Sequence, residues 1–98
     1  MRRQVAIVPV SEAQAGAAAE AGRRLAAAGL RVSVEDSVSS LGGRVRELRA
    51  ERCPAIAVIG PREARDGTLS LRLGREDARI MAIDAAARRM AREFAPPS

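Results

Sequence analysis

Two short, unbroken apolar runs, at residues 5–8 (VAIV) and 55–59 (AIAVI), most constrain what this chain can fold into. Strands that are buried on both faces of a parallel sheet are continuously apolar, whereas strands with one face in water alternate. Pro9 stops the first run, and Pro54 and Gly60 enclose the second. We therefore expect two central strands of a sheet that carries helices on both faces.

The segment that follows the first run predicts a helix and a further strand. Ser11 and Gln14 form an S-x-x-Q pattern, which is typical of a capping box, and Gly29 supplies a stop. These signals predict a helix over residues 12–28. Residues 30–34 alternate apolar and polar side chains, so they predict a strand that completes a βαβ unit.

A second helix is predicted over residues 41–52, ending before Pro54. Its narrow apolar stripe consists of Leu41, Val45 and Leu48. At 100° per residue the charges divide between two flanks. One flank groups residues that can pair with each other, namely Arg44, Glu47 and Glu51. Arg46 and Arg49 share the other flank and have no obvious local partner.

The second half of the chain predicts an antiparallel strand and a last helix. Residues 61–67 are a turn-rich connection, and Asp66-Gly67 is a hairpin signal before a strand at residues 68–73. In that strand three leucines face one way and Arg72 faces the other. An apolar stripe at alternating spacings of three and four predicts the third helix, with Ile80, Ile83, Ala87, Met90 and Phe94.

The order β-α-β-α-β-(β)-β-α predicts a single domain over residues 1–98. We expect a three-layer α/β/α fold, with three helices and a mixed, mostly parallel sheet of about five strands. One antiparallel strand or hairpin is expected to extend the parallel part.

The composition excludes most small-enzyme chemistry. The chain has no His, so His-based acid–base catalysis and the common His/Cys zinc sets are excluded, and its single Cys53 allows no internal disulfide. We expect no catalytic residues, no cofactor and no metal, and an inert Cys53. The apolar run at the N-terminus is too short for a signal peptide or a membrane span, which makes the cytoplasm the default location.

All seventeen basic residues are Arg, against twelve acidic residues, and the net charge is +5. Arg suits bidentate contacts to phosphate and base edges. The codon bias of a GC-rich genome is the better explanation for the absence of Lys. The single aromatic residue, Phe94, excludes recognition by stacking of bases on exposed aromatic side chains.

Two segments of the sequence are the most specific: LGGRVRE at residues 41–47, and the stretch from Gly60-Pro61-Arg62-Glu63 to Arg72. With them the chain resembles the anticodon-binding domain of the class II aminoacyl-tRNA synthetases for His, Gly, Thr and Pro. The resemblance covers residues 4–94 and is closest to the threonyl form. It implies the anticodon-binding-domain fold and a non-catalytic module that binds the anticodon loop of a tRNA.

The resemblance also implies candidate RNA-binding residues. Glu63 and Arg72 occupy the positions of two family residues that read the anticodon, and a third reader, an Asn, is replaced by Val38. An Arg fork and a carboxylate together suit the edge of G or U. Arg46, Arg49 and Arg75 complete the candidate set. An exposed Glu63–Arg72 ion pair is the structural alternative.

Three functional hypotheses remain open. The first is a tRNA-binding module. The second is an accessory subunit that has lost anticodon reading and docks on a synthetase-like protein, which Val38 and the missing family aromatics at Gly43 and Ala55 favour. The third is an excised piece of a full synthetase, against which Met1 suggests an independent gene.

Overall fold

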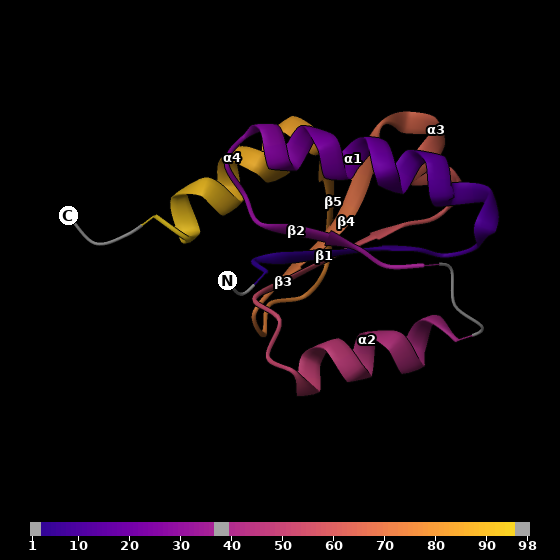
Figure 1. The fold of residues 1–98 in the computed structure, drawn as a ribbon, viewed down its shortest axis with the longest axis horizontal. Coiled ribbons are helices and arrows are strands. Elements are labelled where there is room, and N and C mark those ends of the chain that lie inside the picture. Colours follow the sequence, from indigo (N-terminus) through magenta and orange to yellow (C-terminus); the bar gives the residue numbers. More distant parts are fainter. Residues whose placement is uncertain (1–2, 37–39, 96–98) are drawn as a thin grey trace.

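A five-stranded mixed sheet forms the centre of the structure, a computed structural model that describes residues 3–36 and 40–95 (Figure 1). Its strands, in the spatial order β2-β1-β3-β4-β5, are β2 (Val32–Val34), β1 (Val5–Pro9), β3 (Ala55–Ile59), β4 (Thr68–Leu73) and β5 (Arg79–Ala82). β1 pairs in parallel with β2 and β3, whereas β4 is antiparallel to β3 and β5. The predicted mixed sheet of about five strands is confirmed.

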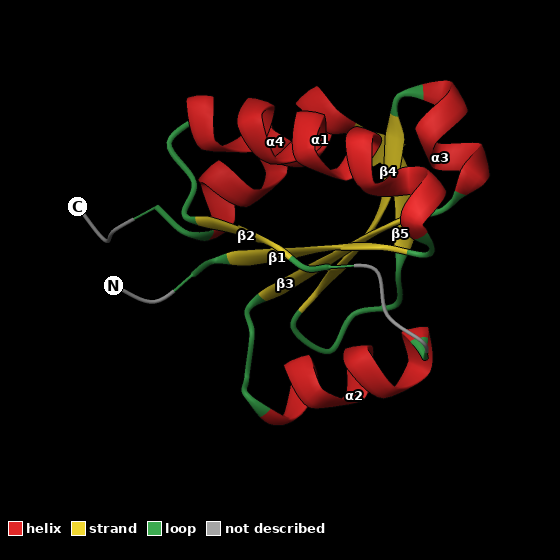
Figure 2. Ribbon diagram, turned by 45° about the vertical axis from the view of Figure 1, so that its right-hand side comes forward, coloured by secondary structure: helices red, strands yellow, loops and turns green. Residues whose placement is uncertain are grey.

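Helices cover both faces of this sheet. The described helices are α1 (Ala15–Ala27), α2 (Leu41–Ala50), α3 (Pro61–Asp66) and α4 (Ile83–Glu93), and a 3₁₀ turn η1 (Glu12–Gln14) precedes α1. Figures 1 and 2 show α1, α3 and α4 on one side of the sheet and α2 alone on the other. The predicted three-layer α/β/α arrangement is therefore confirmed, with one more helix than expected.

The predicted capping pattern does begin the first helical segment. The backbone N–H of Ser11 donates to Gln14 Oε1 at 3.0 Å, and the Ser11 hydroxyl lies 2.8 Å from the same oxygen. Gln14 is buried at 5% exposure, so these bonds also satisfy its carbonyl oxygen away from water. The helical segment begins at Glu12, as predicted, although its first turn is 3₁₀.

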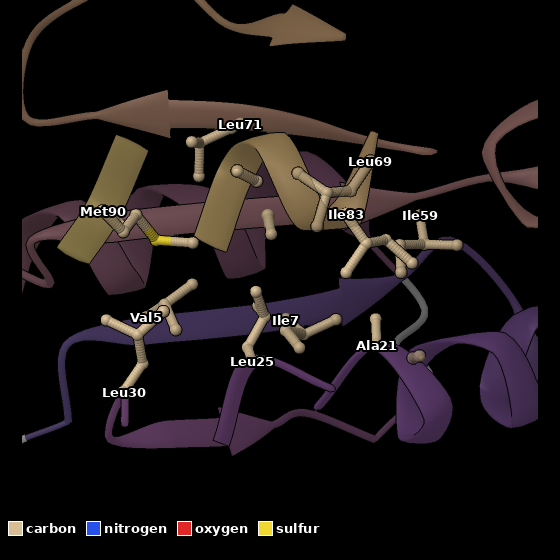
Figure 3. Packing of buried hydrophobic residues seen from close by; sticks show 14 of the residues in the cluster. Val5, Ile7, Ala21, Leu25, Leu30, Ile59, Leu69, Leu71, Ile83 and Met90 are labelled. Atoms are coloured by element: carbon tan, nitrogen blue, oxygen red, sulfur yellow. The ribbon is translucent and has the colours of Figure 1, made fainter. Parts of the chain in front are cut away.

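The main hydrophobic core lies between the sheet and the layer of α1 and α4 (Figure 3). Leu25 of α1 and Met90 of α4 are fully buried there, against the strand residues Val5, Ile7 and Leu69. Burial of side chains of this size contributes about 1.5–3 kcal/mol each to folding. The apolar runs that predicted the central strands therefore also contribute the sheet side of this core.

Gly22 allows α1 to pack closely on the edge of the sheet. A Cβ atom added at Gly22 would lie 2.7 Å from Val34 Cγ2, whereas at Gly16 it would meet nothing within 4 Å. We expect Gly22→Ala to lower the free energy of unfolding by about 1–3 kcal/mol through overpacking. The matched substitution Gly16→Ala should raise it by about 0.5–1 kcal/mol, because Ala favours the helix. Thermal melts of the two variants check this, and equal shifts would contradict it.

The connection before β4 differs from the prediction, because residues 61–66 form the helix α3. Pro61 occupies its first turn, and the side chain of Glu63 accepts the backbone N–H of Gly60 at 2.8 Å. Gly67, at φ +70°, ends this helix. The Asp66-Gly67 signal thus marks a helix end within an antiparallel connection, and a six-residue helix is too short to show an apolar stripe.

The assignment of Ile80 to the last helix is wrong. Ile80 lies in β5, which pairs with β4, and α4 begins only at Ile83. Its side chain is 61% exposed rather than part of the core. The spacing of three between Ile80 and Ile83 fits a helix by coincidence, and the short strand between the turn and the helix lacks its own alternating pattern.

Candidate nucleic-acid interface

The layer formed by α2 covers only part of its face of the sheet. A second hydrophobic cluster joins Leu48 of α2 to Ala6 and Val8 of β1 and Ile56 of β3. The partly buried side chains packed against it come from the same region and are Leu41, Val45, Cys53 and Val58. No described residue of β4 or β5 belongs to this cluster. α2 therefore leaves the β4–β5 half of this face open.

The open half carries polar and exposed side chains. Leu69, Leu71 and Leu73 are buried in the main core, so Ser70 and Arg72, which alternate with them, face the α2 side. Ile80 lies opposite Ser70 in the β4–β5 ladder and thus shares that face. We call Ser70, Arg72 and Ile80 the open sheet face. The predicted outward orientation of Arg72 is confirmed.

The guanidinium of Arg72 is oriented by the turn after β4. Its Nη1 donates to the backbone carbonyl of Glu76 at 3.4 Å, and the Glu76 carboxylate pairs with Arg89 of α4 at 3.0 Å. Arg72 makes no ion pair with a described carboxylate. Since a guanidinium has five N–H donors, most of them remain available to a ligand.

The two flanks of α2 differ in whether their arginines form ion pairs, as predicted. On the β2 side, Arg44 Nη1 lies 3.5 Å from carboxylate oxygens of both Glu35 and Glu47. On the opposite flank, Arg46 and Arg49 are exposed and form no ion pair or side-chain hydrogen bond with any described residue. Arg49 lies beside the turn between β4 and β5, so this flank borders the open half of the sheet.

Glu63 and Arg72 lie in different parts of the structure and do not pair with each other. Arg72 faces the α2 side of the sheet, whereas Glu63 belongs to α3, in the layer on the other side. Arg72 is opposite Ile56 in the ladder, four residues before Gly60, where α3 starts. At about 3.3 Å per residue, Gly60 is thus roughly 13 Å along the strand from the level of Arg72, and Glu63 is three residues further along the chain. The structure therefore offers no support for the exposed Glu63–Arg72 ion pair considered from the sequence.

One oxygen of Glu63 is already used to cap α3. We expect Glu63→Ala to lower the free energy of unfolding by about 1 kcal/mol, because the N–H of Gly60 loses its acceptor. Glu63→Gln should retain most of that stability, since an amide oxygen can also accept this bond. Chemical denaturation of both variants tests this cap, and equal losses would contradict it. Glu63→Gln is then the variant that isolates the role of the carboxylate charge.

Two of the remaining candidates meet at the end of the sheet where β4 finishes. Arg49 and Arg75 line a common pocket of about 630 Å³, together with Arg52, Cys53, Pro54 and Gly74. Arg52 is not among the residues that the sequence predicts to bind RNA. Its position near Arg75 depends on the register of β4 against β3, which no local pattern predicts.

The remaining sequence-based predictions concern Val38, Cys53, metal binding and membrane spans. Val38 lies outside the described residues. Cys53 is half-buried, and its Sγ lies 3.2 Å from the carbonyl oxygen of Ala55. Within residues 3–36 and 40–95, no group of three or more acidic, His or Cys side chains is placed to hold a metal ion. No helix in this described part is long and apolar enough to span a bilayer.

The structure is a small α/β domain. Exposed arginines lie beside its open sheet face, and such a cluster of positive charge attracts polyanions. Comparison with known families gives the particular class. A family model described as an anticodon binding domain matches residues 4–93, and the chain belongs to this family. The resemblance that the sequence motifs indicated is confirmed.

The relatives with similar sequences are threonine–tRNA ligases. The chain is 39% identical to the enzyme of Lactiplantibacillus plantarum over 84 residues, which cover 84% of this chain and 13% of the ligase. It is 38% identical to that of Hyphomonas neptunium over 95 residues, covering 96% of this chain and 14% of the ligase. The chain thus spans only about a seventh of the length of these relatives.

Solved structures agree with this assignment. The RNA binding domain of threonyl-tRNA synthetase from Cryptosporidium parvum superposes with a TM-score of 0.89 at 26% identity, covering 98% of this chain and 24% of that one. A histidyl-tRNA synthetase from Nostoc, at 22% identity and a TM-score of 0.83, shares the fold over 96% of this chain and 22% of its own.

Proposed function

We propose that residues 1–98 act as one non-catalytic domain that binds the anticodon stem-loop of a tRNA. In this proposal the open sheet face receives the anticodon loop, with Arg72 and Glu63 contacting base edges. Arg46, Arg49 and Arg75 neutralise nearby phosphates. As in its ligase relatives, the domain would serve threonine-tRNA charging only together with a separate catalytic part.

The observation that carries this proposal is the unpaired state of the cations around the open face. Arg46, Arg49 and Arg75 form no ion pair with a described carboxylate, whereas Arg44, on the other flank of the same helix, has two. Cations kept without counter-ions beside an exposed polar surface favour a polyanionic partner. Membership of the anticodon-binding family makes a tRNA loop the first choice.

Binding of an anticodon stem-loop measured against salt concentration tests the proposal. With three or four phosphate contacts, the logarithm of the association constant should fall with the logarithm of salt with a slope of about −2 to −4. A fully paired duplex of the same length, which lacks the loop, serves as the control, and it should bind more weakly. No binding at low salt, or equal binding of the two RNAs, would contradict the proposal.

A second candidate is docking on a synthetase-like protein, and the exposed Ile80 on the edge strand β5 favours it. An edge strand has unpaired backbone groups, and a 61% exposed Ile adds apolar surface that a protein partner could bury. Pull-down from the native cell extract, with and without ribonuclease, separates the two functions. A partner retained after RNA removal but lost in Ile80→Ser supports docking, whereas a ribonuclease-sensitive partner supports RNA binding.

A further inference from the structure

Three arginines converge at the end of the sheet where β4 finishes. Arg49 lies in the last turn of α2, Arg52 lies two residues beyond its end, and Arg75 comes from the turn between β4 and β5. The pocket that they line has a volume of about 630 Å³. The N–H of Gly74 donates to the carbonyl of Pro54 at 3.0 Å, which ties this turn to the connection between α2 and β3. The figures place this turn and the end of α2 at the same end of the sheet.

None of these three cations has a counter-ion among the described residues. All three side chains are exposed, and none takes part in an ion pair or a side-chain hydrogen bond. Grouping like charges is unfavourable unless an anion offsets their repulsion. The negative end of the α2 dipole lies close by, but it supplies only about half a charge and does not neutralise three guanidinium groups.

Arg52 adopts a backbone conformation that normally belongs to glycine. Its φ is +60°, and it is the only residue other than Gly with positive φ in the described part of the chain. The N–H of Arg52 donates to the carbonyl of Arg49 and that of Cys53 to the carbonyl of Leu48, both at 3.0 Å. This is the bonding pattern of a helix end at which Gly is preferred. A strained non-Gly residue at such a position points to a use for its side chain.

A neighbouring pocket of about 770 Å³ also includes Arg52, and it is less suited to an anion. It is lined by Glu51 and by Arg3, which are already joined in an ion pair. The carboxylate there would repel a second anion. The pocket shared with Arg49 and Arg75 has no acidic residue in its lining.

We propose that Arg49, Arg52 and Arg75 form a phosphate-binding site that holds the RNA backbone, separate from the base-reading contacts of Glu63 and Arg72. The proposal rests on the RNA-binding function inferred above, and it extends it to a site that includes Arg52. A planar guanidinium can donate two parallel hydrogen bonds to a phosphodiester. Three of them around one pocket can bind one or two adjacent phosphates without reading the bases.

The first test uses inorganic phosphate and needs no RNA. The Nε–Hε signals of arginines in the isotopically labelled chain are followed by NMR while phosphate replaces chloride at constant ionic strength. We expect saturable shifts for Arg49, Arg52 and Arg75 and none for Arg88 and Arg92, which are exposed on α4 and unpaired among the described residues. Equal, linear shifts for all five would overturn the proposal.

The second test exploits the strained backbone of Arg52. Arg52→Gly should raise the melting temperature by a few degrees, because Gly adopts positive φ without strain. The same variant should lose the phosphate-dependent shifts of Arg49 and Arg75. A lower melting temperature together with unchanged phosphate shifts would show that the side chain supports the fold instead, and would overturn the proposal.

Stem-loop binding separates this site from base reading. Arg52→Gly should reduce the slope of binding against salt by about 0.7–0.9 and leave the preference among anticodon sequences unchanged. Arg88→Ala, the control, should change neither. If the stem-loop binds and Arg52→Gly retains the full slope, the phosphate site fails while the proposed function stands. If no stem-loop binds but the phosphate shifts persist, the function fails while the anion site stands.

Discussion

Arg72→Glu is expected to weaken binding of the anticodon stem-loop by about 10- to 100-fold. A guanidinium contact to a base edge contributes about 1–3 kcal/mol to binding, and the introduced carboxylate also repels the RNA phosphates. Arg72 sits on the open sheet face, and its side chain forms one hydrogen bond with the described residues, to a carbonyl at 3.4 Å. The melting temperature should therefore change little, so that the loss of affinity can be assigned to the interface. Fluorescence anisotropy with a labelled stem-loop provides the measurement.

Arg88→Glu is the matched control for this prediction. Arg88 is exposed on α4, in the layer opposite α2, and has no ion-pair partner among the described residues. It should weaken binding by less than about threefold, as expected for a distant charge screened by salt. Arg89 is a poorer control, because it pairs with Glu76 and Glu93. Equal losses for Arg72→Glu and Arg88→Glu would indicate diffuse attraction and contradict a defined site.

Leu48→Ala is expected to lower the free energy of unfolding by about 2–5 kcal/mol, a large fraction of the stability of a domain of this size. Leu48 is the single fully buried side chain of α2, at 1% exposure, and it is the contact that holds this helix against β1 and β3. The loss should move the melting temperature by about 10 °C or more. In hydrogen exchange, the amides of α2 should lose protection before those of β3.

The control is the same substitution at Leu41 in the same helix. Leu41 is only partly buried against the smaller cluster, so Leu41→Ala should cost less than half as much stability. Because α2 carries Arg46 and Arg49, Leu48→Ala should also weaken RNA binding at temperatures where the rest of the chain is folded. Equal destabilisation by the two substitutions, or full protection of α2 in Leu48→Ala, would contradict this account of how the helix is attached.

The sequence predicted the parts of the fold that depend on local pattern. Unbroken apolar runs identify β1 and β3 because buried parallel strands require them, and alternation in β4 placed Arg72 on the outer face. Helical periodicity separated the paired flank of α2 from the flank of Arg46 and Arg49. These features need only the geometry of one element, which the sequence carries directly.

The parts that were missed depend on tertiary structure or on very short elements. α3 has six residues, and the strand β5 has four, so neither displays a full period of its own pattern. The convergence of Arg52 with Arg75 requires the register of β4 against β3 and a positive φ at a residue other than Gly. Nothing in the amino-acid sequence around Arg52 indicates its positive φ.

The most direct test of the central claim is an NMR titration of the labelled chain with an anticodon stem-loop at low salt. We expect amide signals to shift along one surface, formed by the Arg46–Arg49 flank of α2, the Ser70–Arg72 segment of β4 and the first turn of α3 with Glu63. Signals from the outer faces of α1 and α4 should stay in place. Shifts centred on α1 and α4, or no shifts at a large excess of RNA, would contradict it.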